Sequence, residues 1–256
     1  MRLLILGGTW FLGRTLAELA VAREWEVTTF SRGLHGRDAA DTDPVRGRRE
    51  DPGDMARLAD AGPWDAVVDT SGYTPAVVEL ATRALRDRAG QYVLVSTVNV
   101  YRGWPAVLST DESPTYQDAG EAAGPLPLAA KIPALDVVYG QRKAACERVV
   151  QEVFGSADGL VLRPGVILGP YEYIGRLPWL LRRMDRGGQV LAAGPPSRPI
   201  QPVDVRDSRR VHHARRRDGR VRHDERHGSA RPRHLRRTAG GMPRRGRRTG
   251  GARVGG

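Results

Sequence analysis

The chain has 256 residues and a formal net charge of +12, which is concentrated at its C-terminal end. Residues 208–256 hold 17 arginines, no lysine and three acidic residues, whereas residues 1–207 hold 24 basic and 26 acidic residues. A chain of this length can bury one large core with a small appended lobe. Its single cysteine, Cys146, excludes an internal disulfide and a cysteine-based zinc site, and no apolar stretch reaches membrane-spanning length. We therefore expect a cytoplasmic protein without a metal site or membrane contact.

The first predicted strand leads into a glycine-rich turn. An apolar run from Leu3 to Leu6 precedes the sequence GGTWFLG, and a helical pattern follows over Arg14 to Arg23. Glycines in such a turn let backbone N–H groups at a helix N-terminus approach a dinucleotide pyrophosphate. We assign cofactor binding to the whole turn, which consists of Gly7, Gly8, Thr9, Trp10, Phe11, Leu12 and Gly13. Trp10 stands where the usual fingerprint has its middle glycine, so we expect its side chain to point away from the phosphates.

The second predicted strand, Glu26 to Phe30, is followed by Ser31 and Arg32. NAD-selective folds place a carboxylate here to grip the ribose 2′-hydroxyl. Ser31 cannot repel a 2′-phosphate and the Arg32 guanidinium can grip one, so this pair favours NADP, with NAD left open. The alternative is that Arg32 is a solvated surface charge.

The middle of the chain continues to alternate strands and helices. Further short apolar runs predict strands over Ala66 to Asp69, Tyr92 to Ser96 and Leu160 to Arg163, and helical periodicity covers residues 75–88 and Val138 to Phe154. This alternation predicts an α/β fold, a Rossmann-type doubly wound parallel sheet. Residues 102–137 break the rhythm, and we interpret them as a flap-like insertion over the substrate, the alternative being a merely solvated insertion.

Several motifs then occur in a recognisable order. The glycine turn is followed by SxxxVY from Ser96, YxxxK from Tyr139, LRPGVILGP from Leu162 and VDVRD from Val203. This set resembles the extended or atypical short-chain dehydrogenase/reductase superfamily, the NAD-dependent epimerase/dehydratase family, and we expect the likeness to cover residues 1–207 and end there. The resemblance implies a Rossmann NAD(P)-binding domain over residues 1–165 and a small, incomplete substrate lobe over residues 166–207.

The resemblance places Thr97, Tyr139 and Lys143 in catalytic roles. A phenol titrates at about 10, too high for a base at neutral pH, and a nearby ammonium favours the phenolate. Lys143, one helical turn after Tyr139, is expected to lower the Tyr139 pKa and to hold the nicotinamide ribose, while Thr97 orients the substrate oxygen. Sugar dehydratases of the superfamily carry an Asp-Glu pair directly after the catalytic Thr, where this chain has Val98 and Asn99. The chain therefore lacks the general acid and base that a dehydratase uses to eliminate water from a sugar.

The resemblance therefore implies an NAD(P)-dependent oxidoreductase or epimerase. Its small-molecule substrate would carry a hydroxyl or keto group, as in a sugar nucleotide or a similar metabolite. A non-catalytic NADP-sensing or RNA-associated Rossmann protein, or an inactive truncated product, are the alternatives. The sequence leaves open whether the chain forms a homodimer.

The arginine-rich segment from Ser208 onward has no apolar periodicity, and we expect it to be disordered. One interpretation is a basic tail that binds nucleic acid phosphates. The other is translation of a GC-rich gene in a shifted frame. One codon choice for Gly219 to Ser229, read one base later, gives Gly-Val-Ser-Gly-Thr-Thr-Asn-Val-Thr-Ala-Pro, which is similar to a strand of the family. Nucleic acid is a partner only if the tail is genuine.

Overall fold

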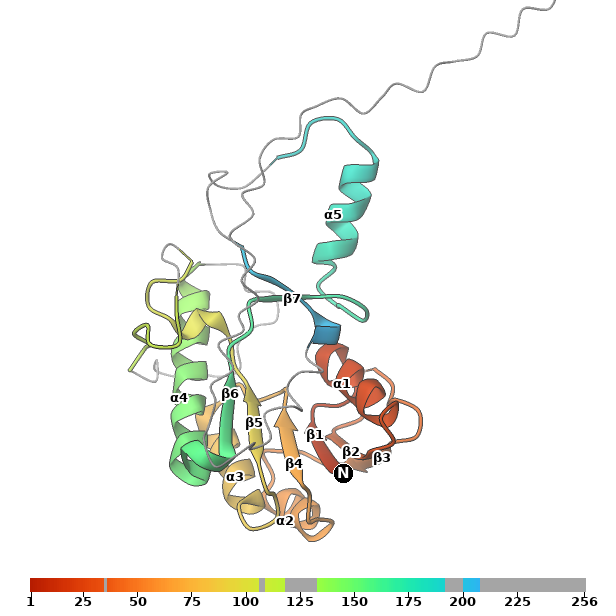
Figure 1. Cartoon of the computed structure of the whole chain (residues 1–256), viewed down its shortest axis with the longest axis vertical. Coiled ribbons are helices and arrows are strands. Elements are labelled where there is room, and N and C mark those ends of the chain that lie inside the picture. Colours follow the sequence, from red (N-terminus) through yellow and green to blue (C-terminus); the bar gives the residue numbers. More distant parts are fainter. Residues whose placement is uncertain (35, 106–108, 118–132, 192–199, 208–256) are drawn as a thin grey trace, which may run out of the picture.

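The computed structural model describes residues 1–34, 36–105, 109–117, 133–191 and 200–207, and within them the chain forms a parallel six-stranded sheet flanked by helices (Figure 1). The strands are β1 (Arg2–Leu6), β2 (Glu26–Ser31), β3 (Asp43–Arg46), β4 (Ala66–Asp69), β5 (Tyr92–Val95) and β6 (Gly159–Leu162). Their order in the sheet is β3-β2-β1-β4-β5-β6. This is the predicted doubly wound order, in which ligands bind where the order reverses beside β1.

Helices cover both faces of the sheet. They are α1 (Phe11–Val21), α2 (Pro52–Asp60), α3 (Pro75–Leu85) and α4 (Pro133–Asp158), the last with one non-helical residue at Gly155. Successive side chains of β1 point to opposite faces of the sheet and contribute to the hydrophobic core on each face. Leu4 and Leu6 pack with α2, α3 and α4, whereas Leu3 and Ile5 pack with α1. All four β1 side chains are at most 1 % exposed, so the strand is buried on both faces, as its continuous apolar run predicts.

Two elements of the Rossmann body differ from the sequence-based expectation. β3 pairs with β2 at the edge of the sheet and contains Pro44 and charged residues, so its sequence has no apolar run. α2 begins after the N-cap Asp51, whose side chain accepts a hydrogen bond from the Asp54 N–H, and only three of its side chains are buried. Both elements therefore depend on pairing and capping more than on hydrophobic pattern.

The C-terminal part of the described chain is small. β7 (Val166–Leu168) pairs in parallel with β8 (Pro202–Asp204), and α5 (Arg176–Asp185) stands beyond this ribbon, away from the main sheet (Figure 1). α5 has no buried residue, and its large apolar side chains are exposed, with Trp179 at 58 % and Leu181 at 60 %. Within the described ranges, then, this lobe lacks a core of its own.

Two predicted segments lie wholly or partly outside the described residues. The arginine-rich segment 208–256 is outside, as are residues 106–108 and 118–132 of the predicted flap. In the described part of that insertion, Tyr101 forms an antiparallel bridge with Thr115. No helix in the described ranges is both long and apolar enough to cross a membrane. The same residues contain no group of three or more His, Cys, Asp and Glu side chains able to hold a metal ion.

Candidate active site

The glycine turn between β1 and α1 leaves no room for a side chain at its glycine positions. Gly7 has a φ of +93°, and a Cβ on Gly13 would lie 2.1 Å from the Gly7 carbonyl oxygen. A Cβ on Gly8 would lie 2.5 Å from the Thr29 methyl carbon. No side chain caps the N-terminus of α1, so its first amides keep their capacity to bind an anion. The turn therefore fits a dinucleotide pyrophosphate.

Trp10 is the N-cap residue of α1, and its indole is 38 % exposed. It stacks on Tyr173 with ring centroids 4.3 Å apart, and Tyr173 also meets Phe11 edge-on at 6.3 Å. Tyr173 belongs to the loop that follows β7. The bulky residue at the middle-glycine position is thus packed against another segment of the chain. The sequence gives no signal for this partner, because 163 positions separate the two rings in the chain.

The carboxyl ends of β2 and β3 form a polar cluster. The register pairs Ser31 with Arg46, and the Arg46 guanidinium donates to the Ser31 hydroxyl at 3.1 Å and to both oxygens of Asp38. Thr29 also donates to Asp38, at 3.4 Å. The Arg46 hydrogen bonds hold the pKa of Asp38 below its usual value. Arg32 is exposed and makes no hydrogen bond or ion pair with the described residues.

The structure thus adds Arg46 and Asp38 to the predicted residues Ser31 and Arg32. Sequence reasoning missed them because β3 was not recognised as a strand. A parallel β2–β3 pair would have placed Arg46 at the same sheet edge as Ser31.

A buried ion pair lies beside the glycine turn. Arg49 binds both oxygens of Asp69, at 2.8 and 2.7 Å, and Tyr92 donates its hydroxyl to the same carboxylate at 2.8 Å. Burial disfavours the charged form of Asp69, but Arg49 and these hydrogen bonds hold its pKa below the usual value. Arg49 also donates to Ser71 at 2.7 Å, in the segment after β4 that packs against Gly7. This pair ties the β3–α2 connection to the turn.

The predicted catalytic residues come together at the carboxyl end of β5. Thr97 follows β5 and its hydroxyl accepts from the Asn99 N–H at 3.2 Å, at the start of the short 3-10 helix η1 (Val98–Val100). Thr97 lies near the Tyr139 phenol on α4. Burial raises the pKa of Tyr139 above its usual value, and the Thr97 side chain opposes that rise. At neutral pH the Tyr139 phenol is therefore protonated.

Lys143 lies one turn further along α4 and is 2 % exposed. Its ammonium donates to the Gly72 carbonyl at 2.6 Å and to the Val95 carbonyl at 2.7 Å. Burial lowers the pKa of Lys143. The sequence predicts that Lys143 lowers the Tyr139 pKa, but that pKa lies above the ordinary phenol value. The Lys143 ammonium donates to two backbone carbonyls and does not offset the effect of burial on Tyr139.

Tyr73, in the connection after β4, was not among the predicted residues. Its ring lies 6.4 Å from that of Tyr139, and the Lys143 ammonium sits 5.5 Å from its centroid. Tyr73 is 48 % exposed, yet the segments that surround its hydroxyl desolvate it enough to raise the pKa of the phenol. An aromatic residue directly after the fourth strand of a doubly wound sheet is the available signal, because that position faces the ligand edge.

A second polar network fixes α4 against the sheet. Glu147 accepts from the buried hydroxyl of Ser96 and from Arg163, whose Nη2 lies 2.7 Å from Oε2. Arg163 also donates to the Tyr101 hydroxyl at 3.1 Å. The Ser96 hydroxyl thus donates to Glu147, whereas Thr97 lies near Tyr139.

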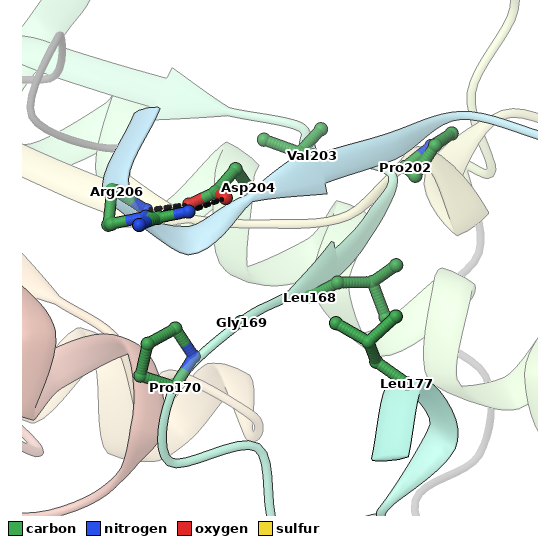
Figure 2. Close-up of a pocket in the computed structure, with 8 residues that line it drawn as sticks. All are labelled: Leu168, Gly169, Pro170, Leu177, Pro202, Val203, Asp204 and Arg206. Atoms are coloured by element: carbon green, nitrogen blue, oxygen red, sulfur yellow. Dashed lines mark hydrogen bonds and ion pairs between the residues drawn. The ribbon is translucent and has the colours of Figure 1, made fainter. Parts of the chain in front are cut away.

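A pocket of about 490 Å³ lies in the C-terminal lobe, between the β7–β8 ribbon and the start of α5. Figure 2 shows its lining, which is Leu168, Gly169, Pro170, Leu177, Pro202, Val203, Asp204 and Arg206. Leu168 and Leu177 lie side by side at one end, and the ion pair of Arg206 with Asp204 marks the other (Figure 2). The pocket therefore combines an apolar wall with one charged pair.

Comparison with known proteins gives the same family as the motifs. The model of the "NAD dependent epimerase/dehydratase family" matches residues 3–221. The match passes Asp207, where we expected the likeness to end, and so includes the first residues of the arginine-rich segment. No curated protein matches the chain in sequence.

Solved structures share the fold at low identity. The Bordetella bronchiseptica enzyme WbmH in complex with NAD⁺ has a TM-score of 0.63 at 19 % identity, over 83 % of this chain and 70 % of that one. A dTDP-glucose 4,6-dehydratase from Bacillus anthracis, in complex with NAD, has 0.62 at 17 %, over 86 % and 73 %. A UDP-glucose 4-epimerase from Thermotoga maritima, with UDP-glucose, has 0.57 at 18 %, over 84 % and 72 %.

Proposed function

The chain belongs to the NAD-dependent epimerase/dehydratase family, and from that premise we propose that it oxidises, reduces or epimerises a hydroxyl or keto carbon of a small metabolite. The observation that carries the proposal is the position of Thr97, Tyr139 and Lys143 together at the carboxyl end of β5, where the Lys143 ammonium donates to the Val95 carbonyl and Tyr139 lies one helical turn before it. A non-catalytic sensor would not require this arrangement.

The glycine turn, with Gly7, Gly8 and Gly13 and the uncapped start of α1, would hold the pyrophosphate of a nicotinamide dinucleotide. When bound, that cofactor supplies or accepts a hydride at its nicotinamide C4. Thr9, Phe11 and Leu12 complete the turn, and Trp10 lies at its rim.

For the cofactor we propose NADP, with a modest preference over NAD. Ser31, Arg32 and Arg46 offer a hydroxyl and two guanidinium groups at the end of β2 and β3, and guanidinium groups bind phosphate in a forked geometry. Asp38 reduces this preference, because it already neutralises Arg46 and would face the 2′-phosphate. The solved relatives WbmH and dTDP-glucose 4,6-dehydratase hold NAD.

The proton chemistry falls to Tyr139. Its raised pKa keeps the phenol protonated, so it can donate a proton to the oxygen of a carbonyl that receives a hydride. In the reverse direction Tyr139 must lose its proton, and the positive charge of an oxidised nicotinamide would favour the phenolate. Thr97, which lies near Tyr139, would orient the substrate oxygen, and Lys143 would hold the helix and the ribose in place.

We propose that residues 1–165 form the cofactor domain and that residues 166–207 contribute to a substrate lobe. The pocket between β7, β8 and α5 supports this division. Its mixed lining suits a nucleotide, with Arg206 and Asp204 for polar groups and leucines for a base or sugar face. We therefore favour a sugar nucleotide as substrate. Val98 and Asn99 after Thr97 favour epimerisation or reduction over elimination, because neither can exchange a proton.

The test is a binding and turnover assay on the whole chain. NADPH and NADH are titrated first. Net oxidation or reduction of the dinucleotide is then followed by absorbance with a panel of sugar nucleotides, and epimerisation, which leaves the dinucleotide unchanged, is followed by chromatography of the sugar products. Tyr139→Phe is expected to retain dinucleotide affinity and to lose turnover. A wild-type chain that binds neither dinucleotide would rule out the proposed function.

A further inference from the structure

The loop between β7 and α5, residues 169–175, makes contacts that the proposed function does not use. It runs from the ribbon to the end of α1 that carries the glycine turn (Figure 1). Gly169, Tyr171 and Gly175 all have positive φ values, of 144°, 65° and 75°. A non-glycine residue such as Tyr171 adopts this conformation only when its surroundings fix it. The loop therefore has one specific shape.

Side chains tether this loop at both of its ends. The Tyr171 hydroxyl donates to Glu18 on α1 at 3.0 Å, and the Arg14 guanidinium lies 4.3 Å from the Tyr171 ring centroid. Glu172 accepts from the N–H groups of Arg176 and Leu177, each at 3.1 Å, and so caps α5. Tyr173, between these anchors, is held over the glycine turn.

The Tyr173 ring lies against the residues that open α1. It stacks on Trp10 with ring centroids 4.3 Å apart and meets Phe11 edge-on at 6.3 Å. Trp10 is the N-cap residue of α1 and Phe11 is its first residue. Tyr173 therefore lies beside the uncapped N-terminus of α1, where the glycine turn would hold the pyrophosphate.

We propose that Trp10 and Tyr173 form an aromatic clasp that retains the dinucleotide and slows its release. The inference rests on the proposed function, because it takes the glycine turn as the pyrophosphate site. The stacked rings cover the turn, exclude water from it and hold the loop of the substrate lobe against the cofactor domain. The clasp accounts for Trp10 at the middle-glycine position, because only an aromatic residue there can stack on Tyr173.

Stopped-flow and equilibrium titrations of NADPH on the full chain test the clasp. Tyr173→Ala is expected to raise the Kd about tenfold, the scale of one aromatic pair, and to do so through faster dissociation. Tyr173→Phe keeps the ring and should stay within about twofold of wild type. Trp10→Ala should match Tyr173→Ala, and the double variant should lose little more, because both remove the same contact. Trp179→Ala, which removes an exposed aromatic on α5, is the matched control and should bind like wild type.

The outcomes separate the clasp from the function on which it rests. If the wild type binds NADPH and Tyr173→Ala, with an unchanged thermal transition, binds and releases it equally, the clasp is wrong and the proposed function stands. Additive effects of Trp10→Ala and Tyr173→Ala also overturn the clasp. A wild type that binds neither NADPH nor NADH overturns both.

Discussion

Arg49→Met should destabilise the fold far more than loss of an ordinary surface charge. The Asp69 carboxylate is fully buried and receives two hydrogen bonds from Arg49. Methionine keeps much of the arginine stem but leaves that carboxylate with the Tyr92 hydroxyl and the Ser71 N–H. Removing one partner of a buried ion pair costs about 3 to 5 kcal/mol, a large share of the usual 5–15 kcal/mol for a domain.

Urea unfolding at pH 7, followed by circular dichroism, measures this loss. The matched control is Arg83→Met, which removes an exposed i,i+4 pair with Glu79 and should cost at most about 0.5 kcal/mol. Asp69→Asn added to Arg49→Met removes the stranded charge and should restore a substantial part of the stability. A cost for Arg49→Met no larger than that of Arg83→Met would refute the reasoning.

The pH dependence gives an independent check with a definite sign. In the wild type the Asp69 pKa is lowered, so its stabilising contribution is present above the usual carboxyl pKa of about 3.9 and is lost as the pH falls through the lowered value. In Arg49→Met only the Tyr92 and Ser71 hydrogen bonds oppose the effect of burial, and we expect the Asp69 pKa to rise. The penalty is then relieved as the pH falls, and the difference between variant and wild type should shrink from pH 7 toward pH 4. A constant difference would contradict the model of a stranded carboxylate.

Four further predictions concern the site. Tyr139→Phe should abolish turnover and leave the NADPH Kd within about twofold, because only the proton-carrying oxygen is lost. Lys143→Met should impair both turnover and NADPH binding, because it also leaves two backbone carbonyls without their donor. Thr97→Val should reduce kcat by about 10²-fold, the scale of losing an orienting group, with unchanged dinucleotide affinity in the same titration. Arg46→Ala should reduce the preference for NADPH over NADH more than Arg32→Ala does, because of these two arginines only Arg46 donates a hydrogen bond to Ser31. Equal effects of the two substitutions would contradict the assignment of the 2′-phosphate contact to Arg46. Because the Tyr139 pKa is raised, carbonyl reduction should stay constant from about pH 6 to 9 and alcohol oxidation should increase with pH, and a decline in reduction near pH 7 would exclude Tyr139 as the donor.

Much of the Rossmann body is legible in the sequence because its central strands are buried on both faces. Continuous apolar runs predict β1, β2, β4, β5 and β6, and the glycine turn marks the start of α1. β3 escapes detection because its four residues include Asp43, Pro44 and Arg46, which leave it without an apolar run. The family resemblance predicts the catalytic roles of Thr97, Tyr139 and Lys143, and the YxxxK spacing places Tyr139 and Lys143 on one helix.

The remaining site residues depend on contacts between distant segments. Arg46 reaches Ser31 through the β2–β3 register, and Tyr173 reaches Trp10 through a loop with three positive φ values. Neither contact has a short-range signature. The Arg49–Asp69 ion pair is a further case, because it joins residues 20 positions apart in the chain.

The spacing of Tyr139 and Lys143 also has a structural cause. The Val95 carbonyl at the end of β5 accepts from Lys143, and the hydroxyl of Ser96, the next residue, donates to Glu147. Thr97, which follows, lies near Tyr139. Tyr139, Lys143 and Glu147 are four residues apart and therefore lie on one face of α4. A slip of the helix by one residue would break both hydrogen bonds at once and deprive a buried ammonium and a buried carboxylate of these partners. The same contacts that fix the register of the helix thus set the position of the Tyr139 oxygen, so the interval between tyrosine and lysine serves packing as well as the proposed proton transfer.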